Sequence, residues 1–387
     1  MSLLLTGASE LLTNDPALGE GRVGRRRDAA LVLEGDQVVW VGDARDAPSC
    51  DECVDVEGRA VVPGFVDSHT HIVFAGERSG EFAARMAGTP YDGGGIARTV
   101  EATRAASDDA LLTAARRRRD ELARSGVTWV EAKSGYGLSV EDEARLVALS
   151  TQVADEVTFL GAHVVPEEYH SRRDEYVRLV STTMLERCAA ATWVDVFVDR
   201  GAFDVDEARE ILLAGRAQGK GLRLHANQIA DIGGARLAAE LAVASADHLT
   251  HVSDDDLDAL AGAGVVATLV PGAEFSTRSI YPDARRFAER GVSVALATDC
   301  NPGTSYVTSM TFVIALAVRE CFMGVDDALW SASAGGAQAL RRDDVGYLRP
   351  GSRADLAVLD APTVAHLAYR PGASLVWSLW RAGVRQF

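Results

Sequence analysis

The chain has 387 residues, of which 39 are Lys or Arg and 56 are Asp or Glu, so its formal net charge is −17. This length suits two or three domains, or one large barrel with an appendage. A surface this acidic repels phosphate groups, which argues against binding to nucleic acid or to an anionic membrane. Five cysteines in so long a chain do not indicate a disulfide framework.

Both ends of the chain have the patterns of short β-strands. Near the N-terminus, strand-like runs cover 3–6, 30–33 and 38–41, and the last two are separated by a Gly-Asp turn. Near the C-terminus, similar runs cover 355–359 and 376–381. We expect the two ends, residues 1–59 and 343–387, to assemble into one small β-sandwich domain.

The middle of the chain alternates short apolar runs with helix-like segments. The eight apolar runs cover 60–66, 127–132, 157–162, 193–198, 222–225, 246–250, 265–270 and 292–298. Continuous apolar strands that alternate with helices indicate a parallel sheet covered on both faces. Eight such units predict an α/β fold, a (β/α)8 TIM barrel over residues 60–342. The alternative, an open doubly wound sheet, is disfavoured because no GxGxxG follows a strand.

The sequence shows no targeting or membrane-spanning pattern. The apolar run at 1–6 has no basic segment before it. No stretch approaches the roughly 20 apolar residues that a membrane span needs. We therefore expect a cytoplasmic protein that has no membrane partner.

Chemistry-bearing side chains follow several of the predicted strands, where barrel enzymes place their active sites. His69 and His71 lie two residues apart after the first run, so both imidazoles project to the same side. His225 follows the fifth run and Asp299 the eighth. Three imidazoles and one carboxylate suit Zn²⁺, and iron also fits. The pattern predicts one metal ion per chain, preferably Zn²⁺.

Such a metal indicates hydrolysis of a C–N bond. A metal-bound water has its pKa lowered to about 7. Asp299 is placed to take the water proton, and His248 to orient the water or to stabilise a developing oxyanion.

Longer motifs resemble known proteins. The segments VPGFVDSHTH (62–71) and GSRADLAV (351–358) resemble the opening and closing signatures of the amidohydrolase superfamily. Within it, the chain resembles the imidazolonepropionase family along nearly its whole length, through HIVFAGER (71–78), GGGI (93–96), KSGYGL (133–138), FLGAH (159–163), HANQ (225–228), SADHL (245–249) and ATDCNPGT (297–304).

The resemblance implies a reaction and a set of residue roles. The implied reaction is hydrolysis of the C–N ring bond of 4-imidazolone-5-propanoate to N-formimidoyl-L-glutamate in L-histidine degradation. The implied metal ligands are His69, His71, His225 and Asp299, and His248 would assist the attacking water. The implied substrate contacts are Arg78, Tyr136, His163, Gln228, Asn301, Gly303 and Thr304. A homodimer is also expected, as is common in the superfamily.

Some positions can also be interpreted from the chemistry of their side chains. The forked guanidinium of Arg78 suits the carboxylate of an anionic substrate. Gln228 stands where some relatives have a Glu; because Gln cannot titrate, its catalytic role would be hydrogen bonding, and proton transfer falls to Asp299 and His248. Lys133 is expected to support the site, since the family resembled uses one metal. The segment between Tyr91 and Gly93 is shorter than is usual in that family.

Two alternatives remain. One is a sister amidohydrolase, such as an aminoimidazole or pyrimidine deaminase, whose base-like substrate gives Arg78 no carboxylate to bind. The other is a non-catalytic scaffold on the same barrel, although scaffolds of this kind usually lose their ligands.

Overall fold

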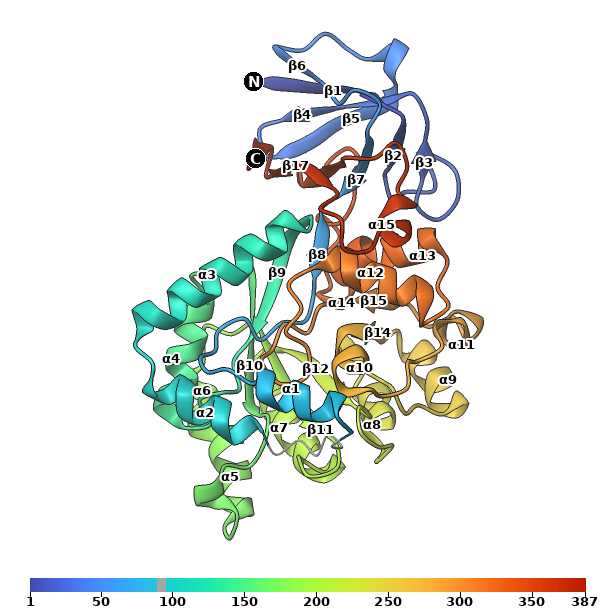
Figure 1. Ribbon diagram of the computed structural model, residues 1–387. Helices are drawn as coiled ribbons and strands as arrows, with labels where there is room; N and C mark the ends of the chain where they lie inside the picture. The colour runs from blue at the N-terminus through green and yellow to red at the C-terminus, as the bar shows by residue number, and fades with distance from the viewer. Residues whose placement is uncertain (89–94) are drawn as a thin grey trace.

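The barrel consists of eight parallel strands, each paired with the next along the chain (Figure 1). The computed structural model describes residues 1–88 and 95–387. The strands are β8 (Phe65–Asp67), β9 (Val127–Lys133), β10 (Glu156–Ala162), β11 (Trp193–Val198), β12 (Gly221–Ala226), β13 (Ser245–His248), β14 (Val266–Leu269) and β15 (Val294–Leu296). Their side chains are almost entirely buried, as expected for a sheet covered on both faces. This confirms the predicted (β/α)8 barrel.

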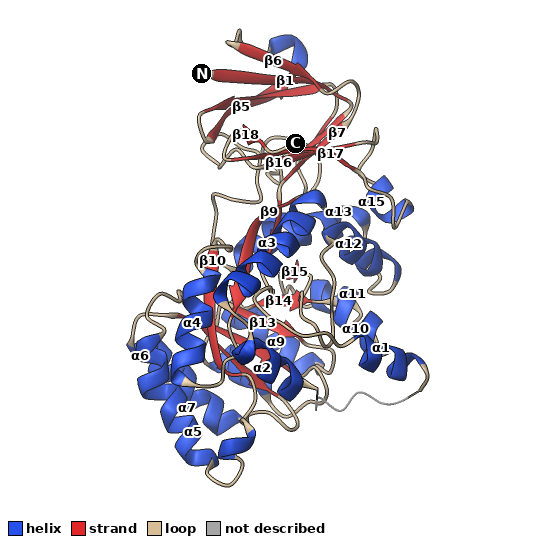
Figure 2. Ribbon diagram, turned by 60° about the vertical axis from the view of Figure 1, so that its left-hand side comes forward, coloured by secondary structure: helices blue, strands red, loops and turns tan. Residues whose placement is uncertain are grey.

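Helices surround the strands (Figure 2). Many begin at a capping side chain: Ser107, Ser139, Asp204, Ser253 and Asp283 each accept a hydrogen bond from a backbone N–H of the first turn. The α-helices are α1 (Ser79–Met86), α2 (Ile96–Ala105), α3 (Asp108–Arg124), α4 (Val140–Ser150), α5 (Arg173–Leu179), α6 (Leu185–Arg187), α7 (Val205–Ala217), α8 (Gly234–Glu240), α9 (Asp254–Ala263), α10 (Pro271–Thr277), α11 (Ala284–Glu289), α12 (Met310–Arg319), α13 (Val325–Trp330), α14 (Gly336–Ala339) and α15 (His366–Tyr369). Two π-helical turns, η3 (Val180–Met184) and η4 (Ser331–Gly335), and two 3-10 turns, η1 (Ala44–Asp46) and η2 (Glu167–Tyr169), complete the set.

The barrel closes between β8 and β15 through the segments that follow these strands. The backbone N–H of Asp299 donates to the carbonyl of His69 at 3.0 Å, and that of His71 donates to the carbonyl of Cys300 at 3.0 Å. The carboxylate of Asp67 accepts hydrogen bonds from the backbone N–H and the hydroxyl of Thr298 at 3.0 and 2.6 Å. The closure therefore holds together the two segments that carry predicted metal ligands.

The seam is covered by η4 and α14, and two glycines let this helix approach the strands. A Cβ on Gly335 would lie 2.4 Å from the carbonyl oxygen of Val294, and one on Gly336 would lie 2.2 Å from that of Val66. Any side chain at either position would force the helix away from the seam.

The two chain ends form a second body, a sandwich of two sheets, and both termini lie in it (Figure 1). One sheet has the order β5-β4-β1-β6 and the other β18-β17-β16-β7-β2-β3. Apolar side chains such as Leu5, Leu31 and Trp380 fill the space between them. The strands are β1 (Ser2–Ala8), β2 (Glu10–Leu12), β3 (Arg25–Arg26), β4 (Ala29–Glu34), β5 (Gln37–Asp43), β6 (Glu52–Asp55), β7 (Ala60–Pro63), β16 (Leu356–Leu359), β17 (Val376–Arg381) and β18 (Val384–Arg385).

The first predicted apolar run, 60–66, divides between the two bodies. Its first part, β7, pairs with β2 and β16 of the end sandwich, and only β8 belongs to the barrel. The apolar run shows no break because both parts are fully buried. The short segment noted between Tyr91 and Gly93 lies outside the described residues.

Among residues 1–88 and 95–387, no helix combines the length and hydrophobicity needed to cross a membrane.

Candidate metal centre and substrate cavity

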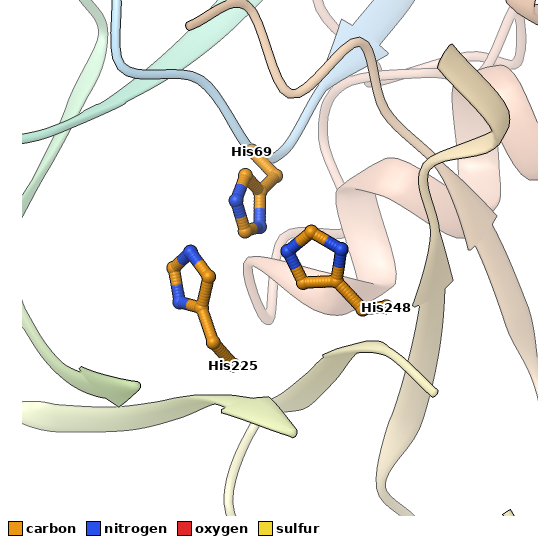
Figure 3. A group of neighbouring side chains, drawn as sticks. All are labelled: His69, His225 and His248. Carbon is orange, nitrogen blue, oxygen red and sulfur yellow. The ribbon is translucent and has the colours of Figure 1, made fainter. Parts of the chain in front are cut away.

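Five side chains converge at the carboxyl ends of the barrel strands. They are supplied by the segment after β8, by β12, by the end of β13 and by the segment after β15. Two overlapping groups have ligand atoms within 4.8 Å of one another: His69, His71 and Asp299 form the first, and His69, His225 and His248 the second. Figure 3 shows the three imidazoles of the second group turned toward one another. None of the five side chains is more than 3% exposed.

The spacing of these atoms fits a metal ion. Asp299 Oδ1 lies 3.4 Å from His69 Nε2 and 3.6 Å from His71 Nε2, and His71 Nε2 lies 3.4 Å from His225 Nε2. Ligand atoms placed tetrahedrally at about 2.1 Å from one Zn²⁺ are separated by about 3.4 Å. His69 Nε2 and Asp299 Oδ2 are buried without a hydrogen-bond partner in the described part of the chain. Buried polar atoms normally have partners, so these atoms fit the role of metal ligands.

His248 lies beside the proposed metal ligands. Its ring centroid lies 5.5 Å from that of His69 and 5.3 Å from that of His225. Burial lowers the pKa of His248 to about 3, so the imidazole is neutral at physiological pH. A neutral imidazole can bind a metal or hydrogen-bond a water beside it.

The backbone that carries these residues is strained. Asp299 has a φ of 50° and His248 a φ of 76°, values that non-glycine residues rarely adopt. Such strain persists only where the surroundings fix the conformation, and it is concentrated at functional sites. Asn227, with a φ of 56°, shows one means of fixing it: its amide donates to the carbonyl of His251 at 2.9 Å and links the loops after β12 and β13.

Charged residues that the sequence analysis did not single out lie inside the barrel below the ligands. Asp247 Oδ2 accepts a hydrogen bond from His69 Nδ1 at 2.6 Å, and Asp195 Oδ2 lies 3.0 Å from His225 Nδ1. A metal-binding histidine usually gives its second ring N–H to such a group. A sequence signal was present, since polar residues occur at every second position within otherwise apolar runs, as in Arg223 and His225.

Lys133 is the central cation of this interior. Its Nζ lies 2.8 Å from Asp195 Oδ2, 3.1 Å from Glu131 Oε1 and 3.7 Å from Asp247 Oδ2. Burial and Arg223 lower the pKa of Lys133, but the three carboxylates outweigh them and raise it above its usual value. Lys133 is therefore a buried cation held among three carboxylates.

Arg78 is held at the edge of the site by an acidic neighbour. Its Nε and Nη2 donate to the carboxylate of Glu81 at 3.1 and 2.7 Å, and the side chain is 3% exposed. A Cβ on Gly303 would lie 2.3 Å from Arg78 Nη1, so a larger residue there would displace the guanidinium from its present position. Gly303 therefore contributes by admitting Arg78.

The loop after Asp299 is organised by Asn301. Asn301 Oδ1 accepts the backbone N–H groups of Gly303 and Thr304 at 2.8 Å each, and its Nδ2 donates to the carbonyl of Asp299 at 2.7 Å. These bonds fix the loop shape around the strained Asp299.

Aromatic rings border the cavity on another side. The His163 ring stacks on His71 with a centroid distance of 5.4 Å, and Tyr136 lies 5.3 Å from His163. His163 Nδ1 is 2.9 Å from the carbonyl oxygen of Gly135, and burial lowers the pKa of His163 to about 4. A flat, mostly uncharged ring wall of this kind suits a flat heterocycle.

One cavity brings the predicted residues together. Its lining combines the metal-binding cluster, the guanidinium and the aromatic wall: His71, Arg78, Ile96, Tyr136, His163, Phe197, His225, Gln228, His248, Asp299, Asn301, Gly303 and Thr304. His69 lies below it, fully buried. Among the described residues, the predicted substrate contacts and metal ligands thus surround or adjoin one space.

Comparisons with known proteins agree with this geometry. Residues 60–383 match the Amidohydrolase family. The chain is 59% identical over 388 residues to an imidazolonepropionase of Salinispora arenicola, covering 100% of this chain and 99% of that protein. It is 57% identical over 383 residues to an imidazolonepropionase of Mycolicibacterium smegmatis, covering 99% and 97% of the two chains.

Solved structures share the fold at low sequence identity. An atrazine chlorohydrolase variant from Arthrobacter aurescens, complexed with zinc and atraton, aligns with a TM-score of 0.71 at 17% identity, covering 99% of this chain and 94% of that one. N-isopropylammelide isopropylaminohydrolase from Burkholderia multivorans aligns with a TM-score of 0.72 at 19% identity, covering 100% and 98%. These structures show the shared fold, and the sequence matches show that the chain belongs to the amidohydrolase family and, within it, to the imidazolonepropionases.

Proposed function

We propose that this chain hydrolyses the C–N ring bond of 4-imidazolone-5-propanoate and releases N-formimidoyl-L-glutamate, a step of L-histidine degradation. The observation that carries the proposal is that a metal-ligand cluster and a fixed guanidinium line the same cavity. The substrate has the matching pair of features, a cyclic amide to be hydrolysed and a propionate to be bound. The relatives named imidazolonepropionase over the full chain length support the same reaction.

We propose one metal ion, with His69, His71, His225 and Asp299 as ligands. Zn²⁺ is the preferred ion and iron is the alternative, since both accept imidazole and carboxylate ligands. When bound, such an ion lowers the pKa of a coordinated water to about 7 and supplies hydroxide near neutral pH.

The chain's own residues bind and orient the substrate. Arg78 pairs with the propionate through the donors that Glu81 does not occupy, and this pairing fixes the substrate's distance from the ligand cluster. Tyr136 and His163 cover the flat ring, and Gln228, which lines the same cavity, hydrogen-bonds to it. Asn301 holds Gly303 and Thr304 in the loop shape that admits Arg78.

Proton transfer is assigned to Asp299 and His248. Asp299 Oδ2 is buried and has no hydrogen-bond partner in the described part of the chain, so this oxygen can accept a proton. Asp299 takes the proton from the attacking water and passes it to the ring nitrogen as the C–N bond breaks. His248, neutral and beside the ligands, hydrogen-bonds to the water or to the developing oxyanion. Gln228 has no titratable proton and only orients.

The proposed function is tested by following the absorbance of 4-imidazolone-5-propanoate while the metal content of the same sample is measured. We expect turnover in proportion to metal content, with about one metal per chain. A fully metal-loaded protein that leaves this substrate intact, yet deaminates an aminoimidazole or a pyrimidine, would replace the proposal with the sister activity. A stoichiometry of two metals would contradict the single-metal centre.

The homodimer and the cytoplasmic location remain predictions. Light scattering of the purified protein tests the first, and fractionation of the source cells tests the second.

A further inference from the structure

Five ionisable side chains are fully buried in the barrel below the metal ligands. Glu131, Lys133, Asp195, Arg223 and Asp247 each have 0% exposure and come from the strands β9, β11, β12 and β13. We call them the buried charge cluster. Removing so many charges from water costs several kcal/mol per ion, and well-packed apolar side chains often replace buried ion pairs without loss of stability. Stability alone therefore does not account for them.

One branch of the cluster leads to His69. Asp247 Oδ2 is 2.6 Å from His69 Nδ1 and 3.2 Å from Arg223 Nη2. A carboxylate can only accept a hydrogen bond, so this contact places the ring proton on Nδ1 and leaves the lone pair of His69 Nε2 for the metal.

A second branch leads to His225. Asp195 Oδ1 accepts the backbone N–H of His225 at 3.0 Å, while Oδ2 lies 3.0 Å from the ring Nδ1. Lys133 Nζ contacts the same Oδ2 at 2.8 Å. Asp195 thus holds the backbone of His225 by a hydrogen bond and places its carboxylate beside the ring.

A third branch leads to the segment between His69 and His71. Glu131 Oε2 accepts the backbone N–H of Thr70 at 3.3 Å, and the hydroxyl of Thr70 donates to the backbone carbonyl of Glu131 at 2.6 Å. The backbone N–H of Lys133 donates to the carbonyl of Thr70 at 2.8 Å. Both ligands of this segment are therefore anchored to β9.

We propose that Lys133 is the positioning residue of the metal centre: its ammonium joins the carboxylates of all three branches and so holds His69 and His225 in place and anchors the backbone between His69 and His71. The inference rests on the proposed function only in taking these histidines as metal ligands. Lys133 is one of two lysines in the chain, the other basic residues being arginines. A compact ammonium can stand among three carboxylates, whereas a planar guanidinium requires a forked partner.

The charge of Lys133 and its proposed positioning role predict opposite effects on Zn²⁺ affinity when Lys133 is replaced. The buried charge cluster contains three carboxylates and two cations, a formal charge of −1. Replacing Lys133 by Met makes it more negative, which by electrostatics alone would tighten the binding of a cation. If Lys133 acts by positioning the histidines, the same change weakens binding, because the ligands lose their fixed orientation.

The experiment measures the dissociation constant of Zn²⁺ for metal-stripped full-length protein, by competition with a chromophoric chelator. We expect Lys133→Met to raise the constant about 10–100-fold, the effect usual for residues that orient metal ligands. Excess Zn²⁺ should restore much of kcat, with KM unchanged. A dissociation constant equal to or lower than that of the wild type would overturn the proposal.

Two further variants keep the test decisive. The double variant Glu131→Gln with Lys133→Met keeps the formal charge of the cluster at −1. It should therefore fold even if the single variant does not. The Zn²⁺ affinity of the double variant should still be weakened. Wild-type affinity in the folded double variant would refute the role of Lys133. The matched control is Lys220→Met. Among the described residues, Lys220 Nζ hydrogen-bonds to backbone carbonyls, the nearest that of Ala191 at 2.6 Å, and its loss should change thermal stability without changing Zn²⁺ affinity.

This experiment is independent of the reaction. It measures metal binding without substrate, so weakened binding in a protein that does not hydrolyse the imidazolone would support the positioning role and reject only the proposed function.

Discussion

The end sandwich and the barrel interior are equally buried but chemically opposite. Between the sheets of the sandwich lie apolar side chains such as Leu31 and Trp380, at most 1% exposed. Inside the barrel, Lys133 and Arg223 lie among carboxylates with no exposure at all. The first interior derives its stability from removing apolar surface from water. The second accepts a desolvation cost to fix ligand geometry. Substitutions should therefore separate stability from function.

The largest expected effect is the loss of a metal ligand. His69→Ala removes the imidazole shared by both ligand groups, and Asp299→Ala removes the carboxylate. We expect either variant to lose turnover by at least about 10³-fold, the scale of removing an essential catalytic group, and to lose its metal on dialysis. Absorbance assays and metal analysis check both outcomes; unchanged turnover would rule out the mechanism.

A substitution in the core of the sandwich should lower stability and leave metal binding unchanged. Leu31→Ala leaves a cavity in its core and should lower the free energy of unfolding by about 2–5 kcal/mol, while the Zn²⁺ affinity of the folded protein stays unchanged. Leu31→Met conserves volume and should cost less than about 1.5 kcal/mol. Denaturant unfolding measures the first quantity. A parallel loss of metal affinity in Leu31→Ala would show that the two interiors are coupled.

A buried carboxyl group near the site allows a test in which the stability of the protein depends on pH. Burial raises the pKa of Glu274 from 4.5 to about 7, although Thr250 donates a hydrogen bond to it at 2.7 Å. The folded state therefore holds this proton more tightly than the unfolded state. Stability is unaffected below pH 4.5, falls as pH rises toward about 7, and stays lower above it.

Glu274→Gln removes this titration and should make the protein more stable at pH 8 by about 3 kcal/mol, with little difference at pH 4.5. Unfolding of both proteins across this range provides the measurement. A stability difference that does not vary with pH would show that Glu274 is not responsible.

The smallest expected effect concerns substrate binding. Arg78→Lys keeps the charge but loses the fork that Glu81 and the propionate share. KM should rise about tenfold, equivalent to about 1.4 kcal/mol, with kcat and unfolding little changed. A substrate analogue without the carboxylate should be insensitive to the change. If that analogue is affected equally, Arg78 does not bind the carboxylate.

Patterns among neighbouring residues were sufficient to predict much of the fold and part of the site. The eight apolar runs and the capping residues predicted the barrel, because side-chain periodicity and first-turn hydrogen bonds depend on nearby residues. The paired histidines His69 and His71 were evident for the same reason, since alternation on an extended segment is a local property. Placement after the fifth and eighth runs added His225 and Asp299, and the family motifs added the candidate substrate contacts.

Only the tertiary structure determined which other residues these side chains contact. The apolar run 60–66 could not show its division between β7 and β8, since both halves are buried alike. The contacts of Lys133 with Asp195 and Asp247 join residues more than 60 positions apart, and the closure of the barrel alone brings them together. The sequence by itself determined the fold, the family and the chemistry available; the tertiary structure determined the charge geometry, because strand pairing selects which distant side chains share one interior.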